Sequence, residues 1–256
     1  MLESYYKIVY YHFEEKMEIG IYGLGRFGSF FATKMIEQGH QVYGFSRSGK
    51  TDLPGIIYSD EETVLSQKYI FFCVAISAFE EVIKKCAKKI SNDSVVCDTC
   101  SVKLFPCEIM EKYLPENIQI MATHPMFGPD SAKNGLKNLP LVICPVRVDR
   151  AKVDYWEKEF SSWGLDVFKM SPDRHDREAA YSQGITHFLG RTLKELDLPY
   201  TDLATVGYKS LMEIVEQTCN DSLTLFKDLQ HYNPYAVNMR RDLKRALQET
   251  MNALEW

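Results

Sequence analysis

Short apolar runs alternate with amphipathic stretches in the part of the chain before Pro172. The apolar runs are continuous, as in buried strands, and the stretches between several of them repeat apolar residues at helical spacing. The predicted strands are Glu18–Tyr22, Gln41–Phe45, Tyr69–Ala75, Ser94–Cys97, Ile118–Ala122, Leu141–Cys144 and Asp166–Lys169. The predicted helices are Gly28–Gln38, Ala78–Lys89, Cys107–Tyr113 and Asp149–Trp163. This order predicts an α/β fold with a mostly parallel sheet covered on both faces.

From Pro172 onward the pattern becomes helical throughout. Helices are predicted at Asp173–Leu196, Asp202–Leu225 and Val237–Leu254. One apolar helix face is formed by Leu203, Val206, Tyr208, Leu211, Ile214 and Val215. A helical region of about 85 residues is small for an independent core, and association is one remedy. We therefore predict an α/β domain over residues 17–171 and an all-helical domain over residues 172–256, through which the protein forms a homodimer.

Residues 1–16 fit neither pattern, and Met17 directly precedes the first predicted strand. We interpret them as an N-terminal extension, either disordered or the result of a start placed upstream of Met17. They lack the basic start and apolar core of a secretory signal.

The seven cysteines are odd in number and irregularly spaced, which indicates reduced thiols in a cytoplasmic protein. The Cys97-x-x-Cys100 pair has no second pair at zinc spacing, so no metal site is predicted.

Composition excludes several classes of protein. The chain has 256 residues, 45% of them hydrophobic and 25% charged, which is typical of globular proteins rather than disordered ones. Its net charge is -5 and it has no basic stripe, which argues against a nucleic-acid partner. The longest apolar run, Tyr69 to Phe79, is too short to span a bilayer, so no membrane partner is expected.

The first predicted strand leads directly into the pattern GxGxxG. Gly23 suits a tight turn, Gly25 lets a diphosphate approach the backbone, and Gly28 lets the next helix pack on the strand. The N-terminus of that helix offers free N–H groups to phosphates. We therefore predict a Rossmann-type nucleotide-binding domain; the alternative is a glycine turn that binds nothing. The predicted cofactor contacts here are Gly23, Leu24, Gly25, Arg26, Phe27 and Gly28.

The end of the second strand distinguishes between the two nicotinamide cofactors. NAD sites place an acidic residue there for the ribose hydroxyl. Here the strand ends in Ser46, Arg47 and Ser48. Hydroxyls and a guanidinium suit a 2′-phosphate, so we predict NADP; the alternative is a solvated arginine in a surface loop.

Two polar segments follow strands at the edge where ligands bind in open parallel sheets, Asp98–Lys103 and Thr123–Asp130. His124 lies in the second segment among Gly and Pro residues. An imidazole titrates near neutral pH, so we predict that His124 is a general base; the alternative is a histidine that only holds a loop. His40 precedes the second strand and is expected at the surface.

Several motifs together resemble the prephenate and arogenate dehydrogenase family of tyrosine biosynthesis. They are GLGRFG at 23–28, SVK at 101–103, HPMFGP at 124–129, RHDREAA at 174–180, SQGITH at 182–187, DSL at 221–223 and YNP at 232–234. HPMFGP behind a nucleotide-binding domain is highly specific, whereas the nucleotide motif is not. The match covers roughly residues 17–245. The SQxITH, DS and YNP segments are most similar to the plant-type arogenate branch.

The resemblance implies an oxidative decarboxylation of a small-molecule substrate, arogenate or prephenate. The substrate loses a hydride from ring C4 to NADP, loses its ring carboxylate as carbon dioxide, and becomes aromatic; arogenate gives tyrosine. By similarity, His124 accepts the C4 hydroxyl proton, and Ser101 orients that hydroxyl and the nicotinamide.

The chain departs from prephenate-type members at two places. Their Ser-His-x-x-His run is SQGITH here, and Gln183 and His187 share one helix face, where they are expected to contact the substrate. The alternative for His187 is a role in a buried polar network. Their Phe-Arg-Asp-x-x-Arg segment ends here in Glu213, which cannot bind a carboxylate. The cation that replaces the arginine stays open among Lys209, Arg191, Arg240 and Arg241.

Asp221 stands at the position of the acid in the DS motif of arogenate-type members. A carboxylate there would pair with the ammonium of arogenate and disfavour prephenate, which has a ketone instead. The alternative is a solvated or capping aspartate.

These observations predict an NADP-dependent arogenate dehydrogenase. A prephenate or dual-specificity cyclohexadienyl dehydrogenase is the nearest alternative. A non-catalytic NADP-sensing protein is an alternative of another class, and the presence of His124, Ser101 and the full HPMFGP run argues against it.

Overall fold

The structure is a computed structural model and describes residues 16–49 and 52–254, so residues 1–15 of the predicted extension lie outside it. Its centre is an eight-stranded sheet in the order β3-β2-β1-β4-β5-β6-β7-β8. The strands are β1 (Glu18–Tyr22), β2 (Gln41–Phe45), β3 (Ile57–Tyr58), β4 (Tyr69–Phe72), β5 (Val95–Asp98), β6 (Gln119–Pro125), β7 (Pro140–Arg147) and β8 (Asp166–Lys169). All neighbours pair in parallel except β6 and β7, which are antiparallel. The predicted mostly parallel α/β sheet is confirmed.

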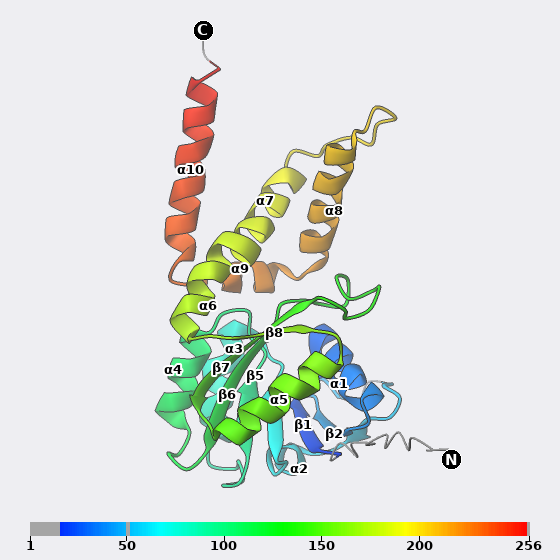
Figure 1. Ribbon diagram of the computed structural model, residues 1–256, viewed down its shortest axis with the longest axis vertical. Coiled ribbons are helices and arrows are strands. Elements are labelled where there is room, and N and C mark those ends of the chain that lie inside the picture. The colour runs from blue at the N-terminus through cyan, green and yellow to red at the C-terminus, as the bar shows by residue number, and fades with distance from the viewer. Residues whose placement is uncertain (1–15, 50–51, 255–256) are drawn as a thin grey trace, which may run out of the picture.

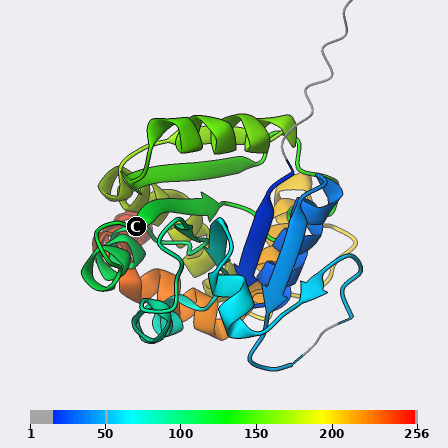
Figure 2. The same cartoon turned by 90° about the horizontal axis from the view of Figure 1, so that it is seen from below.

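Helices cover both faces of the sheet (Figure 2). They are α1 (Arg26–Glu37), α2 (Glu61–Leu65), α3 (Ile76–Cys86), α4 (Leu104–Tyr113) and α5 (Arg150–Ser162). α1 and α5 pack on one face around Phe31 and Trp156, which are fully buried. α2, α3 and α4 pack on the other around Phe72 and Phe79. Strands buried on both faces have no polar side to expose, which explains runs such as the four buried residues of β4.

The chain after β8 is entirely helical. Its elements are α6 (Pro172–Ala179), the π-helical turn η1 (Ala180–Gly184), α7 (Ile185–Lys194), α8 (Val206–Asn220), α9 (Leu223–Tyr232) and α10 (Ala236–Asn252). α7 and α8 lie side by side and point away from the sheet, and α10 stands apart from them (Figure 1). α7 and α8 pack closely because Gly190 has no side chain: a Cβ there would lie 2.1 Å from Thr218 Oγ1. The boundary between residues 171 and 172 as a division into domains stays a prediction.

Three local predictions are wrong. The predicted helix Asp202–Leu225 is broken, because Asp221 is extended and the Ser222 side chain caps α9 by accepting a hydrogen bond from Leu225 N. β6 runs three residues further than predicted, to Pro125, so His124 lies within the strand instead of after it. His40 is 7% exposed rather than at the surface, since its Nε2 lies 2.9 Å from Oε1 of the buried Glu159. The short elements β3 and α2 were not predicted.

Among the described residues, no helix is long and apolar enough to cross a membrane. The seven cysteines all lie in this part of the chain and are free.

Candidate active site

A cleft of about 680 Å³ runs along the carboxyl ends of β1, β4, β5 and β6 and is closed from the other side by the helical region. The sheet contributes the glycine loop, the segment after β5 with Ser101, and the loop after β6. The helices contribute Gln183, His187 and Asp221. Residues distant in sequence therefore meet at the edge where open α/β sheets bind ligands.

The glycine loop at the cleft fits the diphosphate of a dinucleotide. Gly23 has a φ of +106°, and a Cβ on it would lie 2.4 Å from the carbonyl oxygen of Cys73. A Cβ on Gly28 would lie 1.9 Å from the carbonyl oxygen of Gly23, so only glycine allows α1 to pack this closely. Gly25 has open space where its Cβ would be, which leaves room for a ligand against the backbone. No side chain caps α1, so its first N–H groups are available to an anion.

Ser46, Arg47 and Ser48 follow β2 and lie outside the residues that line the cleft. Ser46 Oγ and Ser48 Oγ are 2.9 Å apart, and the side chain of Arg47 is exposed. This is the end of the strand where a Rossmann-type fold holds the adenosine ribose of its cofactor.

His124 is buried and belongs to a chain of three side chains. Its Nδ1 lies 2.8 Å from His175 Nε2, and His175 Nδ1 lies 2.8 Å from Asp176 Oδ1. A carboxylate only accepts, so His175 donates from Nδ1 to Asp176. Its neutral Nε2 must then accept the proton of His124 Nδ1. This arrangement leaves a lone pair on Nε2 of His124, as a general base requires.

Backbone N–H groups of the segment after β5 hold Asp176 in place. Its two carboxylate oxygens accept hydrogen bonds from Lys103 N at 2.6 Å and Leu104 N at 3.0 Å. Asn233 Nδ2 donates to its carbonyl oxygen at 2.8 Å. The motif containing Ser101 and Lys103 is thereby tied to α6, which carries His175 and Asp176.

Burial lowers the pKa of His124 well below its usual value near 6.5, and the neighbouring His175 and Lys103 lower it further. The Lys103 ammonium is itself fully buried, pairs with the Asp98 carboxylate and donates to Thr123 O at 2.6 Å. A positive charge behind His124 disfavours the imidazolium. His124 is therefore neutral at pH 7.

Gln183 and His187 bring unsatisfied polar atoms to the helical wall of the cleft. The π-helical turn η1 carries Gln183, and π-turns occur frequently at functional sites. Gln183 Oε1 and His187 Nδ1 are buried and have no hydrogen-bond partner among the described residues. His187 Nε2 lies 3.9 Å from Asp221 Oδ2. Buried polar atoms are normally paired, so these two atoms are free to bind a polar ligand or a water molecule.

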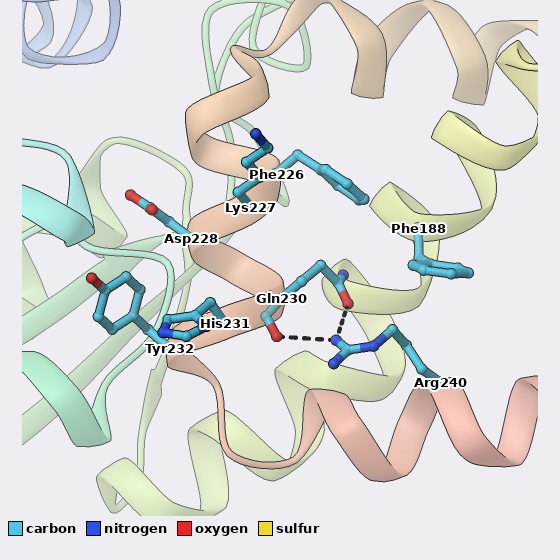
Figure 3. A pocket seen from close by; sticks show the side chains of 8 residues that line it. All are labelled: Phe188, Phe226, Lys227, Asp228, Gln230, His231, Tyr232 and Arg240. Atoms are coloured by element: carbon cyan, nitrogen blue, oxygen red, sulfur yellow. Dashed lines mark hydrogen bonds between the residues drawn. The ribbon is translucent and has the colours of Figure 1, made fainter.

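None of the four predicted carboxylate-binding cations lines the cleft among the described residues. Arg191 donates to the main-chain oxygen of Asp221 at 2.5 Å, and Arg240 donates to Gln230 in a second pocket (Figure 3). Lys209 and Glu213 are exposed on α8. The one arginine or lysine that lines the described cleft is Arg26.

Two cysteines near the site, Cys97 and Cys100, are buried. Burial raises the pKa of the Cys97 and Cys100 thiols well above their usual range, so neither is a thiolate at neutral pH. Within residues 16–49 and 52–254, no group of three His, Cys, Asp or Glu side chains is placed to hold a metal ion.

Comparison with known proteins places this arrangement in a family. The family model described as "Prephenate dehydrogenase, nucleotide-binding domain" matches residues 31–164, and the model "TYRAAT1-like, C-terminal domain" matches residues 192–255. The chain belongs to the prephenate dehydrogenase family. Arogenate dehydrogenase 2, chloroplastic, of Arabidopsis thaliana is 32% identical to this family member over 95% of the chain and 72% of the relative. Arogenate dehydrogenase 1 of the same plant is 38% identical over 87% of the chain, which spans only 37% of that relative.

Solved structures show the same fold at lower identity. Prephenate dehydrogenase from A. aeolicus, in complex with hydroxyphenyl propionate and NAD+, matches with a TM-score of 0.72 and 19% identity over 92% of this chain and 89% of that one. Synechocystis arogenate dehydrogenase matches with a TM-score of 0.69 and 21% identity over 92% and 91%. The predicted family and fold are confirmed.

From the sequence, His175 and Asp176 were recognised only within the motif RHDREAA, and no role was predicted for either residue. The signal was a His-Asp pair at the start of a helix, which becomes meaningful only when His124 is placed beside it.

The protonation state of His124 is open to direct measurement by nitrogen-15 NMR on histidine-labelled protein. We expect His124 to be neutral at pH 6 and to carry its proton on Nδ1, since burial and Lys103 lower its pKa. The spectrum of His124→Gln assigns the signal. A midpoint at or above pH 6.5, or a proton on Nε2, would contradict the proposed hydrogen-bond chain.

Proposed function

We propose that the protein is an NADP-dependent arogenate dehydrogenase that converts arogenate to tyrosine. The observation that carries the proposal is the shared cleft, which brings together a diphosphate-type glycine loop, Ser101, the helix-derived Asp221 and Pro125, the residue next to the buried His124. The arogenate dehydrogenases among its relatives support the substrate. We also propose a cytoplasmic location, because a chain with seven unpaired cysteines suits a reducing compartment.

Each residue of the site has a separate role in the proposed reaction. The bound nicotinamide supplies the hydride acceptor. His124 Nε2 accepts the proton of the C4 hydroxyl as the C4–H bond breaks, so the electrons of the O–H bond form a C4=O bond. The electrons of the bond to the ring carboxylate then make the ring aromatic as carbon dioxide leaves, and the proton held by His124 returns to the phenolate oxygen. Ser101 orients the hydroxyl. Aromatisation supplies driving force, so the protein mainly has to align C4 and exclude water.

Removing the base tests this assignment. His124→Ala should lower the turnover number by about 10²–10⁴, the usual contribution of a general base, while NADP affinity stays unchanged. Stopped assays of tyrosine formation and a separate NADP titration measure the two effects. Retained turnover would remove His124 from the mechanism.

The preference for NADP rests on the side chains after β2. Arg47→Ala should raise the Michaelis constant for NADP by about tenfold or more, because a charge-assisted contact to the 2′-phosphate is lost. The constant for NAD, which lacks this phosphate, should hardly change. Equal effects on both cofactors would refute the assignment.

Asp221 is the proposed selector for the substrate ammonium. Its carboxylate lines the cleft and is partly buried, which strengthens a charge pair there. Asp221→Asn should lower kcat/KM for arogenate by about 30-fold, as for other half-buried charge pairs, and raise the ratio for prephenate over arogenate. An unchanged ratio would show that another group selects the substrate.

A homodimer through the helical region completes the proposal. Leu203 is 88% exposed and Val206 82% exposed, and Leu247, Met251 and Leu254 at the end of α10 are exposed as well. Beside α10, a second pocket of about 530 Å³ lies between α7 and α9, with Phe188 and Phe226 among its walls (Figure 3). Apolar faces of this kind are normally covered. We expect sedimentation equilibrium to give twice the chain mass; a monomer at micromolar concentration would contradict it.

A further inference from the structure

One arginine joins three segments of the chain across the cleft. Arg26 is the first residue of α1, and its Nη2 lies 2.6 Å from Oδ1 of Asp130 in the loop after β6. Its Nη1 lies 3.3 Å from Oδ1 of Asp221, at the turn between α8 and α9. All three side chains line the cleft. The guanidinium therefore bridges the sheet domain and the helical region at the site itself.

Among the described residues, a single guanidinium contacts both carboxylates of this cluster. Arg26 serves both Asp130 and Asp221. His187 is the other described basic side chain within 4 Å of the Asp221 carboxylate, and burial lowers the pKa of His187, so it is neutral at pH 7. Arg191 donates to the main-chain oxygen of Asp221, and from there its charge lowers the pKa of the Asp221 carboxyl without occupying the carboxylate oxygens. An additional cation is thus favoured beside Asp221, provided that Arg26 leaves room for it.

Arg26 is also in position to respond to a dinucleotide. It belongs to the GxGxxG turn, and the uncapped N-terminus of α1 suits a diphosphate. A guanidinium forms strong, bidentate contacts with phosphate oxygens. A diphosphate bound at this turn would compete with the two aspartates for Arg26.

We propose that Arg26 couples cofactor binding to recognition of the substrate ammonium group. In the cofactor-free enzyme, the guanidinium occupies the Asp221 oxygen that an ammonium would use. The diphosphate draws Arg26 away and leaves the Asp221 carboxylate free for an α-amino acid. The inference rests on the proposed function, because it takes Asp221 as the site of the substrate ammonium.

The coupling should be modest and specific for charge. Arg26 is 48% exposed at its side chain, and partly exposed ion pairs of this kind correspond to about a two- to fivefold change in affinity. The affinity for a ligand without an ammonium group should not depend on Arg26. Two ligands that share a phenol ring, one with and one without an amino group, are therefore compared. The comparison separates this effect from simple stacking of the ligand on the nicotinamide.

Isothermal titration calorimetry of wild-type, Arg26→Gln and Asp130→Asn proteins tests the inference. L-Tyrosine and 4-hydroxyphenylpropionate are titrated into each protein, without cofactor and with saturating NADP+, and an NADP+ titration verifies that each variant is folded and saturated. In the wild type, NADP+ should improve tyrosine binding about two- to fivefold more than hydroxyphenylpropionate binding. In Arg26→Gln this excess should disappear, because tyrosine already binds the cofactor-free protein well.

Asp130→Asn is the matched variant with the opposite expectation. It leaves Arg26 with Asp221 as its remaining carboxylate partner in the cluster, so the excess for tyrosine should grow. An undiminished excess in Arg26→Gln would overturn the inference while leaving the proposed function intact. Failure of tyrosine to bind the NADP+-saturated wild type would overturn the inference, whereas an unchanged substrate ratio in Asp221→Asn would overturn the role of Asp221 in the proposed function.

Discussion

The buried carboxylate of Asp176 is the constraint on which the site depends. It accepts two backbone N–H groups from the segment after β5 and the imidazole N–H of His175. A buried carboxylate with fewer partners would cost several kcal/mol, so these bonds fix where α6 lies against the sheet. Through His175 the same group sets which nitrogen of His124 carries the proton. One side chain therefore links the docking of the helical region to the chemistry of the base.

The polar groups of the cleft fall into two sets with different electrostatics. His124 is buried, and burial together with the nearby Lys103 ammonium keeps the imidazole neutral. Asp221 is only partly buried, and burial raises the pKa of its carboxyl while Arg26 and Arg191 lower it. The first set suits proton acceptance from a hydroxyl. The second suits binding of a cation, and it is built from both parts of the chain.

The sequence predicted the parts of the structure that follow from local pattern. Continuous apolar runs identified seven of the eight strands, and β3, with two residues, was too short to show. Spacing placed the glycine turn before α1. The break at Asp221 was missed because apolar periodicity continues through it, although Asp and Ser are residues that favour helix ends. Here this break matters, since it turns the Asp221 side chain toward the cleft.

Long-range contacts could not be predicted from local pattern. His40 was expected at the surface, because its partner Glu159 lies 119 residues away. The four candidate cations for the substrate were chosen by residue type, yet none of them lines the described cleft, where Arg26 of the nucleotide motif contacts the Asp221 carboxylate. His175 and Asp176 gained a role only when folding placed them behind His124. Pairings of this kind depend on how α6 to α9 sit on the sheet.

The most direct measurement follows reduced-nicotinamide absorbance with arogenate or prephenate, each with NADP+ or NAD+. The account predicts that arogenate with NADP+ has a kcat/KM at least about tenfold above each other combination, as one favourable charge contact provides. Comparable turnover of prephenate would contradict Asp221 as the selector. Equal use of NAD+ would contradict the role of Arg47, and binding of NADP+ without turnover of either substrate would contradict the assignment as an enzyme.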